Sequence, residues 1–349
     1  MVSKIKLVDE LSPDGSSRFF IMVSLLNILN NKNKTIKLLD VGGSSPYMAS
    51  ALNSLNAPFE ISVIDILPKP EHFKGEYIQG DALNMPFADN SFDTVISTDV
   101  LEHIPYQNKI DFVHECLRVA KNYVIIAAPF DSDAVDAAEH ATNDLNVKLF
   151  DVGQSWLEEH FEYKKPNLDN VLQAINKKGY EAEVVGSNNL YNWILSTHLN
   201  LVEAKLGLDS KKLININKLF NKSLLTSNDM SPPFYRHFVV VSKKNLSIDK
   251  KEKIDALRNP SVSHKESIIY IHSLLTLVAE KMKESDIKMK QLEKTSNSEV
   301  YDLNKQIDNL KSELADKQSI IDKCRPYIYL LNGGPFSKIG RGKKSKKQI

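Results

Sequence analysis

The sequence predicts an α/β protein built on a doubly wound, mostly parallel seven-stranded sheet, followed by a long C-terminal coiled-coil helix. Short apolar runs alternate with helical patterns over the first ~245 residues, which is typical of strands and their crossover helices. The apolar runs are hydrophobic almost throughout, as expected where both faces of a parallel sheet are buried. Further along, apolar residues recur at heptad spacing instead.

Each apolar run defines one expected element. The expected strands are residues 36–43, 59–66, 76–82, 91–98, 122–130, 180–186 and 236–244. The expected helices are residues 16–31, 46–56, 107–119, 168–178, 190–206 and 211–225. The last strand of such a sheet often inserts antiparallel to the others. Ser16 or Ser17 is expected to cap the first helix, and the polar segment 131–160 is expected to be irregular.

The composition fits a protein with a hydrophobic core and gives no global signal for nucleic acid. The 349 residues are 42% hydrophobic and 26% charged, and 45 basic side chains nearly balance 44 acidic ones. The two cysteines, Cys116 and Cys324, predict neither a disulfide framework nor a metal cluster, which fits a reducing cytosol. The sequence shows no signal peptide, and no apolar run approaches the ~20 residues of a membrane helix, so we expect a cytoplasmic protein.

A turn of small residues follows the first expected strand. Asp40 ends that strand, and Gly42, Gly43 and Ser44 lead toward the next helix. Such a turn lets the backbone approach a ligand closely, and the helix start presents free N–H groups. The adjacent glycines do not form the G-x-G-x-x-G pattern of dinucleotide sites, and a tight turn without a ligand stays an alternative.

Polar residues also follow the next three strands. Asp65 ends the second strand, where a carboxylate can accept hydrogen bonds from ribose hydroxyls or cap a helix. Asp81 and Ala82 follow the third strand, where a carboxylate and a backbone group can read an adenine ring. Thr98 ends the fourth strand. Because open α/β sheets bind ligands at the carboxyl ends of their strands, these residues are expected to face one crevice.

These motifs resemble those of class I S-adenosylmethionine-dependent methyltransferases, in particular the broad group acting on small molecules. The matching segments are Asp40–Ser44 for D-x-G-x-G, Gly80–Asp93 for G-D-A-x-x-L-P-F-x-D-x-S-F-D, and Leu101–His103 for L-E-H. The similarity is tight over residues 36–130 and loose over residues 1–245. Met85 replaces a leucine, and Ser44 replaces the second glycine of the first motif, which leaves that turn's geometry open.

The resemblance implies a Rossmann-like methyltransferase fold that binds S-adenosyl-L-methionine. The residues it implies are Asp40, Gly42, Gly43 and Ser44 at the methionine moiety, Asp65 at the ribose, Ile66, Asp81 and Ala82 at the adenine, and Thr98 near the sulfonium. Because the sulfonium already activates the methyl group, the protein must position the acceptor and, for a hydroxyl, supply a base.

Histidines are the candidates for that base. His103 belongs to the L-E-H motif at the expected pocket mouth, and His160 lies in the segment expected to cover the substrate. His140 is a further candidate. For each, the alternative is a solvated or hydrogen-bonded surface histidine.

The favoured reaction is O-methylation of a sugar or surface-glycan intermediate, a step of polysaccharide biosynthesis. Residues 160–185 and 232–244 loosely resemble methyltransferases associated with surface-glycan assembly. A small-metabolite O- or N-methyltransferase is one alternative, and a non-catalytic scaffold of a glycan-assembly complex is another. A nicotinamide-dependent oxidoreductase is disfavoured because the G-x-G-x-x-G pattern is missing.

The C-terminal heptads predict a coiled coil that joins copies of the chain into a homo-oligomer, with a lone helix packed on the domain as the alternative. The expected domains are a catalytic domain at 1–245 with substrate-side insertions at about 131–165 and 187–235, a linker at 246–264, a coiled coil at 265–325 and a basic tail at 326–349. Ser285 and Lys317 interrupt the apolar stripe, and Pro326 is expected to end the helix. The tail is expected to be flexible or to contact an anionic surface, such as the inner face of a membrane.

Overall fold

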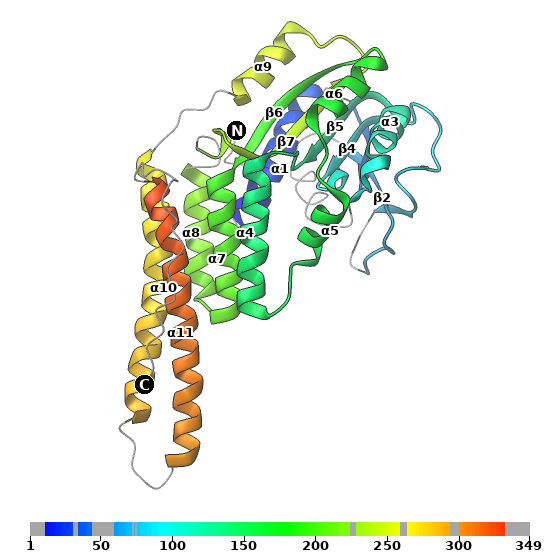
Figure 1. Ribbon diagram of the computed structural model, residues 1–349. Helices are drawn as coiled ribbons and strands as arrows, with labels where there is room; N and C mark the ends of the chain where they lie inside the picture. Colours follow the sequence, from blue (N-terminus) through cyan, green and yellow to red (C-terminus); the bar gives the residue numbers. More distant parts are fainter. Residues whose placement is uncertain are drawn as a thin grey trace. The chain divides into compact units, whose positions relative to one another are not determined.

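The computed structural model describes residues 11–30, 34–43, 59–71, 73, 75–223, 228–258, 264–293 and 300–331 (Figure 1). The chain divides into two compact units, Met1–Leu277 and Val278–Ile349. Among the described residues, no helix is both long enough and apolar enough to cross a membrane.

The first unit is built on one seven-stranded sheet. Its strands are β1 (Ile36–Val41), β2 (Phe59–Asp65), β3 (Glu76–Gln79), β4 (Phe92–Thr98), β5 (Ala120–Ala128), β6 (Glu181–Asn189) and β7 (Phe234–Ser242). They lie in the order β3-β2-β1-β4-β5-β7-β6. β7 pairs antiparallel with both β5 and β6, and the remaining neighbours pair in parallel. The predicted fold class and the antiparallel last strand are therefore confirmed.

The structure contains helices that the sequence predicts and others that it does not. The α-helices are α1 (Pro13–Leu29), α3 (Lys109–Val119), α4 (Asp133–Phe150), α5 (Ser155–Tyr163), α6 (Leu168–Lys177), α7 (Leu190–Leu206), α8 (Ser210–Ser223), α9 (Ile248–Arg258), α10 (His264–Glu293) and α11 (Val300–Leu331). Of these, α1, α3, α6, α7 and α8 correspond to helices that the sequence predicts. Short 3-10 turns are η3 (Leu101–His103), η4 (Tyr106–Asn108) and η5 (Asn228–Met230). The helix expected at 46–56 lies outside the described residues.

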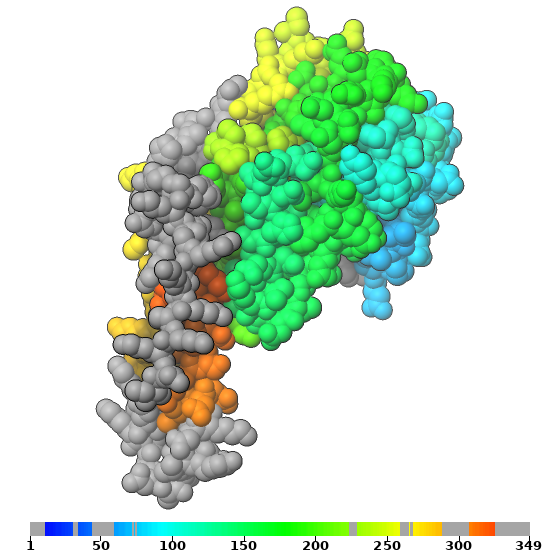
Figure 2. Space-filling model, viewed as in Figure 1, coloured from blue at the N-terminus to red at the C-terminus, as the bar shows by residue number. Residues whose placement is uncertain are grey.

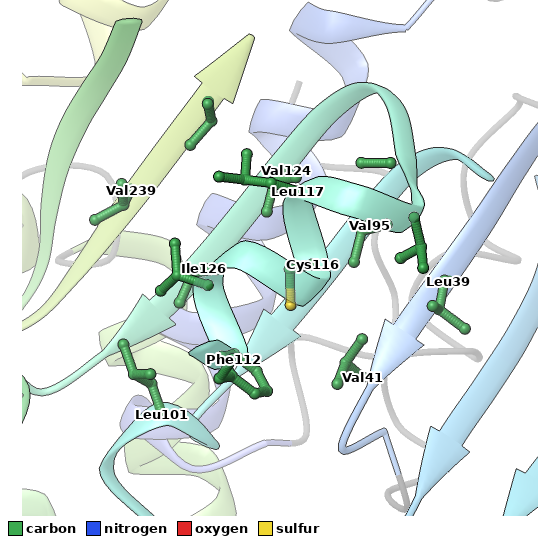
Figure 3. Packing of buried hydrophobic residues seen from close by; sticks show 14 of the residues in the cluster. Leu39, Val41, Val95, Leu101, Phe112, Cys116, Leu117, Val124, Ile126 and Val239 are labelled. Carbon is green, nitrogen blue, oxygen red and sulfur yellow. The ribbon is translucent and has the colours of Figure 1, made fainter. Parts of the chain in front are cut away.

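The main hydrophobic core lies between the sheet and helices α3 and α6. Phe112 and Cys116 of α3 point toward Val41 of β1 and Val95 of β4, and all four side chains are fully buried (Figure 3). Each such side chain stabilises the fold by roughly 1.5–3 kcal/mol relative to an exposed one. Burial also raises the pKa of the Cys116 thiol, so this cysteine is a packing residue.

The opposite face of the sheet is covered by α1. Thr94, which neighbours the core residue Val95 on β4, turns its hydroxyl toward Asn30 at the end of α1 (3.1 Å). The predicted cap of this helix is wrong, because the N-cap is Ser12, whose side chain accepts from the backbone N–H of Gly15. Pro13 at the first helical position favours this earlier start, since its fixed φ suits the first turn.

The prediction that 131–160 is irregular is also wrong, because this segment forms α4 and α5. The Ser132 hydroxyl caps α4 by accepting from Val135 N, and Asp133 and Asp136 lie in its first turn, where negative charge stabilises a helix. α4 lies beside α7, with the Thr142 hydroxyl 3.1 Å from His198 Nε2. In the space-filling view α4 and the segment after it form one continuous surface, drawn in teal and green (Figure 2).

The predicted linker at 246–264 contains α9, which packs on the sheet unit. Lys250 Nζ donates to Leu29 O at the end of α1 (2.6 Å), and Arg258 Nε donates to Val184 O of β6 (2.8 Å). Ile254 is fully buried between these two anchors. The sheet unit therefore extends at least through α9.

In the second unit, the end of α10 and α11 lie side by side, and the two misfits of the heptad pattern meet (Figure 1). Lys317 is fully buried, hydrogen-bonds Ser285 of α10, and forms an ion pair with Glu313 one turn earlier (3.1 Å). A matched buried polar pair of this kind fixes the register between two helices. The self-association expected of residues 265–325 stays a prediction.

The expectation that Pro326 ends the last helix is wrong, because α11 continues to Leu331. A proline removes one hydrogen bond from the ladder and costs about 3 kcal/mol relative to alanine, so a long helix can continue past it. Most of the predicted basic tail lies outside the described residues.

Candidate functional site

The strand order brings the expected site residues to one edge of the sheet. β1 lies between β2 and β4, so that Asp40 pairs with Val63 on one side and Ile96 on the other. Asp65 therefore ends β2 just beside the turn after β1, and Thr98 ends β4 on the other side of it. Gly80 N, after β3, donates to Asp65 O (2.9 Å). Four consecutive carboxyl ends thus lie side by side, at the end of the sheet where open α/β sheets bind ligands.

Two glycines leave the backbone bare at the centre of this edge. Gly42 has φ +77°, and a Cβ there would lie 2.2 Å from Val100 Cγ2. A Cβ on Gly43 would lie 2.3 Å from Asp40 Oδ2. A side chain at either position would therefore clash unless Val100 or Asp40 moved. Ser44, which the resemblance places in the same turn, lies outside the described residues.

Asp40 and Asp65 concentrate negative charge beside this turn. Burial, together with the nearby charge of Asp65, raises the pKa of Asp40 to about 7. A cationic ligand group at this edge would relieve that repulsion. Two neighbouring carboxylates without a compensating cation do not stabilise a fold, and such pairs are typical of binding sites.

Short side-chain turns hold the carboxylates at the ends of β2 and β3. Asp65 Oδ1 accepts from Leu67 N (2.9 Å), and Asp81 Oδ1 accepts from Leu83 N (2.8 Å). Residues 66–71 form no helix, so the alternative that Asp65 caps a helix is wrong. Ile66 follows at 73% exposure, which leaves an apolar surface next to the Asp65 carboxylate.

The end of β4 presents polar atoms with no partner among the described residues. The hydroxyls of Ser97 and Thr98 are both buried, and neither has a hydrogen-bond partner. Buried hydroxyls are nearly always paired, so an unpaired one next to a bare glycine turn indicates a place for a ligand group.

Beyond Thr98, a buried ion cluster ties three elements together at the same edge. Arg236 of β7 is 1% exposed. It donates two hydrogen bonds to Asp99, from Nε to Oδ1 (2.6 Å) and from Nη2 to Oδ2 (2.8 Å). Arg18 and Asp14 of α1 complete the cluster. Burial raises the pKa of Asp14, but the charges of Arg236 and Arg18 outweigh it, so the pKa is lowered.

Sequence reasoning missed this cluster. The available signal was Arg236 at the head of an otherwise apolar strand, since an arginine there needs buried partners. Its partners come from segments more than a hundred residues away, and a single sequence does not reveal such pairs.

The structure brings the two candidate bases together. His103 in η3 and His160 in α5 face each other with their Nε2 atoms 3.4 Å apart. His103 Nδ1 lies 2.7 Å from Glu159 Oε2, and His160 Nδ1 lies 2.9 Å from Glu139 Oε1. Each ring is thus held from behind by a carboxylate.

Buried residues of helix α4 and strand β7 form a hydrogen-bond network with His160 of this pair. Glu139 is fully buried and also accepts from Lys165 Nζ (2.7 Å) and from the Tyr235 hydroxyl (2.9 Å). Burial raises the pKa of Glu139, but the hydrogen bond from His160 and the charge of Lys165 outweigh it, so the pKa is lowered. The pKa of His103 is lowered, chiefly by burial and then by the neighbouring ring of His160.

A buried lysine holds the η3 turn that carries His103. Lys109 Nζ donates to three backbone carbonyls, those of Leu101 (2.7 Å), Glu102 (3.1 Å) and Ile104 (2.6 Å). Burial lowers the pKa of Lys109 to about 8. The position of His103 is therefore set by the fold rather than by a mobile loop.

His140, the third candidate base, lies apart from this pair. Its side chain is exposed, and its ring stacks on Phe161 with ring centroids 4.2 Å apart. For His140 the alternative of a surface histidine fits the structure.

Comparison with known proteins finds methyltransferases. Residues 39–128 match a family model described as "Methyltransferase domain". An uncharacterized methyltransferase of Mycobacterium tuberculosis is 29% identical over 110 residues, covering 27% of this chain and 41% of that protein. One from Mycobacterium marinum is 30% identical over 110 residues, with the same coverage. The matches span only about two fifths of these relatives.

Solved structures of methyltransferases are also similar at low identity. A SAM-dependent methyltransferase from Archaeoglobus fulgidus has a TM-score of 0.39 at 13% identity, covering 65% of this chain and 94% of that one. Phosphoethanolamine N-methyltransferase 2 of Haemonchus contortus, in complex with S-adenosyl-L-methionine, has a TM-score of 0.41 at 18% identity, covering 64% of this chain and 52% of that one.

Proposed function

We propose that this chain transfers a methyl group from S-adenosyl-L-methionine to an acceptor hydroxyl. The observation that carries the proposal is the row of polar groups at the carboxyl ends of β3, β2, β1 and β4, arranged around two glycines where a side chain would clash. The methyltransferase-domain match covers the same residues, 39–128.

The residues at this edge fit the cofactor. Asp40 and the bare turn at Gly42 and Gly43 would hold its methionine part, where an ammonium group would compensate the burial and the neighbouring Asp65 charge that together raise the pKa of Asp40. Asp65 would accept hydrogen bonds from the ribose, and exposed Ile66 would pack against the adenine. The remaining expected contacts are Ser44 in the same turn, Asp81 and Ala82 at the adenine, and Thr98 near the sulfonium. The cofactor supplies a methyl group on a sulfonium.

A base near the acceptor supports a hydroxyl as the group that is methylated. A neutral histidine whose Nδ1–H is held by a carboxylate presents a bare Nε2, which is the form that accepts a proton. In both His103 and His160 the Nδ1 atom lies beside a carboxylate oxygen, as this form requires. The favoured acceptor is a sugar or a surface-glycan intermediate, on the loose sequence resemblance of residues 160–185 and 232–244.

Calorimetric titration with S-adenosyl-L-methionine tests cofactor binding. Wild type should bind, and Asp65→Ala should bind at least about tenfold more weakly, since it loses charge-assisted hydrogen bonds to the ribose. Asp169→Ala, which removes an exposed carboxylate at the start of α6, should bind like wild type. Absence of heat with wild type at high micromolar concentration would overturn the cofactor assignment.

Mass spectrometry of products tests the acceptor. The protein, cofactor and a panel of nucleotide sugars, oligosaccharides and small alcohols or amines are incubated, and each product is searched for one added methyl group. Methylation at a sugar oxygen supports the proposal. Methylation only at nitrogen, or only of small metabolites, would contradict the acceptor class while leaving methyl transfer in place.

A further inference from the structure

Three side chains of η3 and α5 bring possible metal-ligand atoms close together. Glu102, His103 and His160 each offer one ligand atom, and these atoms all lie within 4.8 Å of one another. Glu102 and His103 come from η3, whereas His160 comes from α5, so two separate segments of the chain build the group. η3 and α5 belong to the same compact unit.

The protonation pattern of the two histidines makes their close approach unusual. A carboxylate can only accept a hydrogen bond, so the Nδ1 atoms next to Glu159 and Glu139 must carry the protons. In the neutral rings both Nε2 atoms then bear bare lone pairs. The two Nε2 atoms lie 3.4 Å apart, and two unprotonated nitrogens cannot hydrogen-bond each other. A cation between them would turn this repulsion into attraction.

The distance between the two nitrogens suits a shared metal ion. In tetrahedral coordination with metal–nitrogen bonds of about 2.0–2.1 Å, two imidazole nitrogens lie about 3.3–3.4 Å apart. The observed separation of 3.4 Å agrees with this value. The carboxylates behind both rings complete the carboxylate–histidine–metal arrangement that orients metal ligands in proteins.

Glu102 supplies the third donor. Its side chain is 1% exposed, and its Oε2 atom is buried without a hydrogen-bond partner among the described residues. Lys109 fixes the backbone of Glu102, because its ammonium group donates to the carbonyl of Glu102 and to those of Leu101 and Ile104. A buried carboxylate oxygen left unpaired costs free energy that coordination would recover.

We propose that Glu102, His103 and His160 form a binding site for a divalent transition-metal ion of the Zn²⁺ type. Two imidazoles and one carboxylate are donors that suit zinc, iron, cobalt or nickel better than magnesium or calcium, which prefer all-oxygen sites. Three protein ligands leave a coordination position open, as in catalytic rather than structural metal sites.

The test of this inference does not depend on the proposed methyl transfer, because metal binding is measured without cofactor or acceptor. An ion at this site would use both Nε2 atoms as ligands. The two histidines would then no longer be the proton acceptors in an O-methylation, and their substitution would affect activity through the metal.

The test uses the full chain without a histidine tag, stripped with a chelator that is then removed. Calorimetry with Zn²⁺ should give one ion per chain, and Co²⁺ should give visible d–d absorption of a site with nitrogen and oxygen ligands. Glu102→Gln and His160→Gln should each weaken Zn²⁺ binding at least about tenfold. His140→Gln, the same substitution at an exposed histidine of α4, should leave binding unchanged.

X-ray absorption at the zinc edge of the wild-type protein gives a readout that needs no variant. Two imidazole ligands at about 2.0–2.1 Å support the proposal. Absence of stoichiometric Zn²⁺ binding by wild type would overturn it. So would Zn²⁺ affinity that is equal in wild type, Glu102→Gln and His160→Gln, or an absorption spectrum without imidazole scattering.

Discussion

Replacing Asp229 by asparagine should make the protein more stable at neutral pH, and the gain should disappear as the pH falls. Asp229 in η5 is fully buried. Its Oδ1 accepts from Asn189 N (3.2 Å) and Asn192 Nδ2 (3.4 Å), whereas Oδ2 has no partner among the described residues. Burial raises its pKa from 3.8 to about 7, because the charged form loses its hydration.

The sign follows from proton linkage. The folded protein holds a proton on Asp229 between the two pKa values, whereas the unfolded chain releases it. The contribution of this group to stability is therefore complete below 3.8 and is lost as the pH rises toward 7. Between these two pKa values the protein loses about 4 kcal/mol of unfolding free energy through this group. Roughly 2.5 kcal/mol of this loss falls between about pH 5 and about pH 8. An asparagine side chain at this position would keep the shape and one acceptor and never ionises, so Asp229→Asn should lose none of this stability.

Urea unfolding at several pH values measures the effect. The difference in unfolding free energy between Asp229→Asn and wild type should grow by roughly 2.5 kcal/mol from about pH 5 to about pH 8. Asp169→Asn, which changes an exposed carboxylate, should follow wild type throughout. Parallel curves for Asp229→Asn and wild type would show that Asp229 does not titrate in this window, and the reasoning from burial would be refuted.

Three further predictions concern the glycine turn, the ion cluster and the C-terminal helices. Gly43→Ala places a Cβ against the Asp40 carboxylate, so the affinity of this variant for S-adenosyl-L-methionine, measured by calorimetry, should fall at least about tenfold. Its circular dichroism spectrum should stay unchanged. Unaltered affinity would contradict the assignment of the glycine turn to the cofactor. Arg236→Leu removes the buried guanidinium that pairs with both Asp14 and Asp99 and leaves Arg18 as the remaining cation of the cluster, so the unfolding free energy in urea should fall by about 3 kcal/mol, and adding Asp99→Asn should recover part of it. A loss below about 1 kcal/mol would count against the cluster. Light scattering should give a mass of at least two chains for the full protein and of one chain for residues 1–258; equal states of assembly would refute self-association through residues 265–325.

The sequence predicted the sheet well because its strands carry the information themselves. Strands β1, β2, β4 and β5 are short, mostly apolar runs, and such runs need burial on both faces. The same argument placed Asp40, Asp65 and Thr98 at strand ends, and parallel order then brings strand ends together.

Other features depended on contacts that the local pattern does not show. The segment 131–160 reads as irregular because polar and acidic residues are scattered along α4, and its helical form depends on its cap and on packing beside α7. In the sequence, Ser285 and Lys317 only interrupt the apolar heptad stripe, whereas in the structure they hydrogen-bond each other. The convergence of His103 and His160 likewise depends on how α5 folds back onto η3.

Hydrogen–deuterium exchange with and without S-adenosyl-L-methionine tests most directly whether the edge formed by β3, β2, β1 and β4 is the cofactor site. Adding the cofactor should slow exchange in the segments 40–43, 65–67, 80–83 and 97–100, and should leave α6 and α9 unchanged. Unchanged exchange at the four segments, or protection confined to other parts of the chain, would contradict the proposed site.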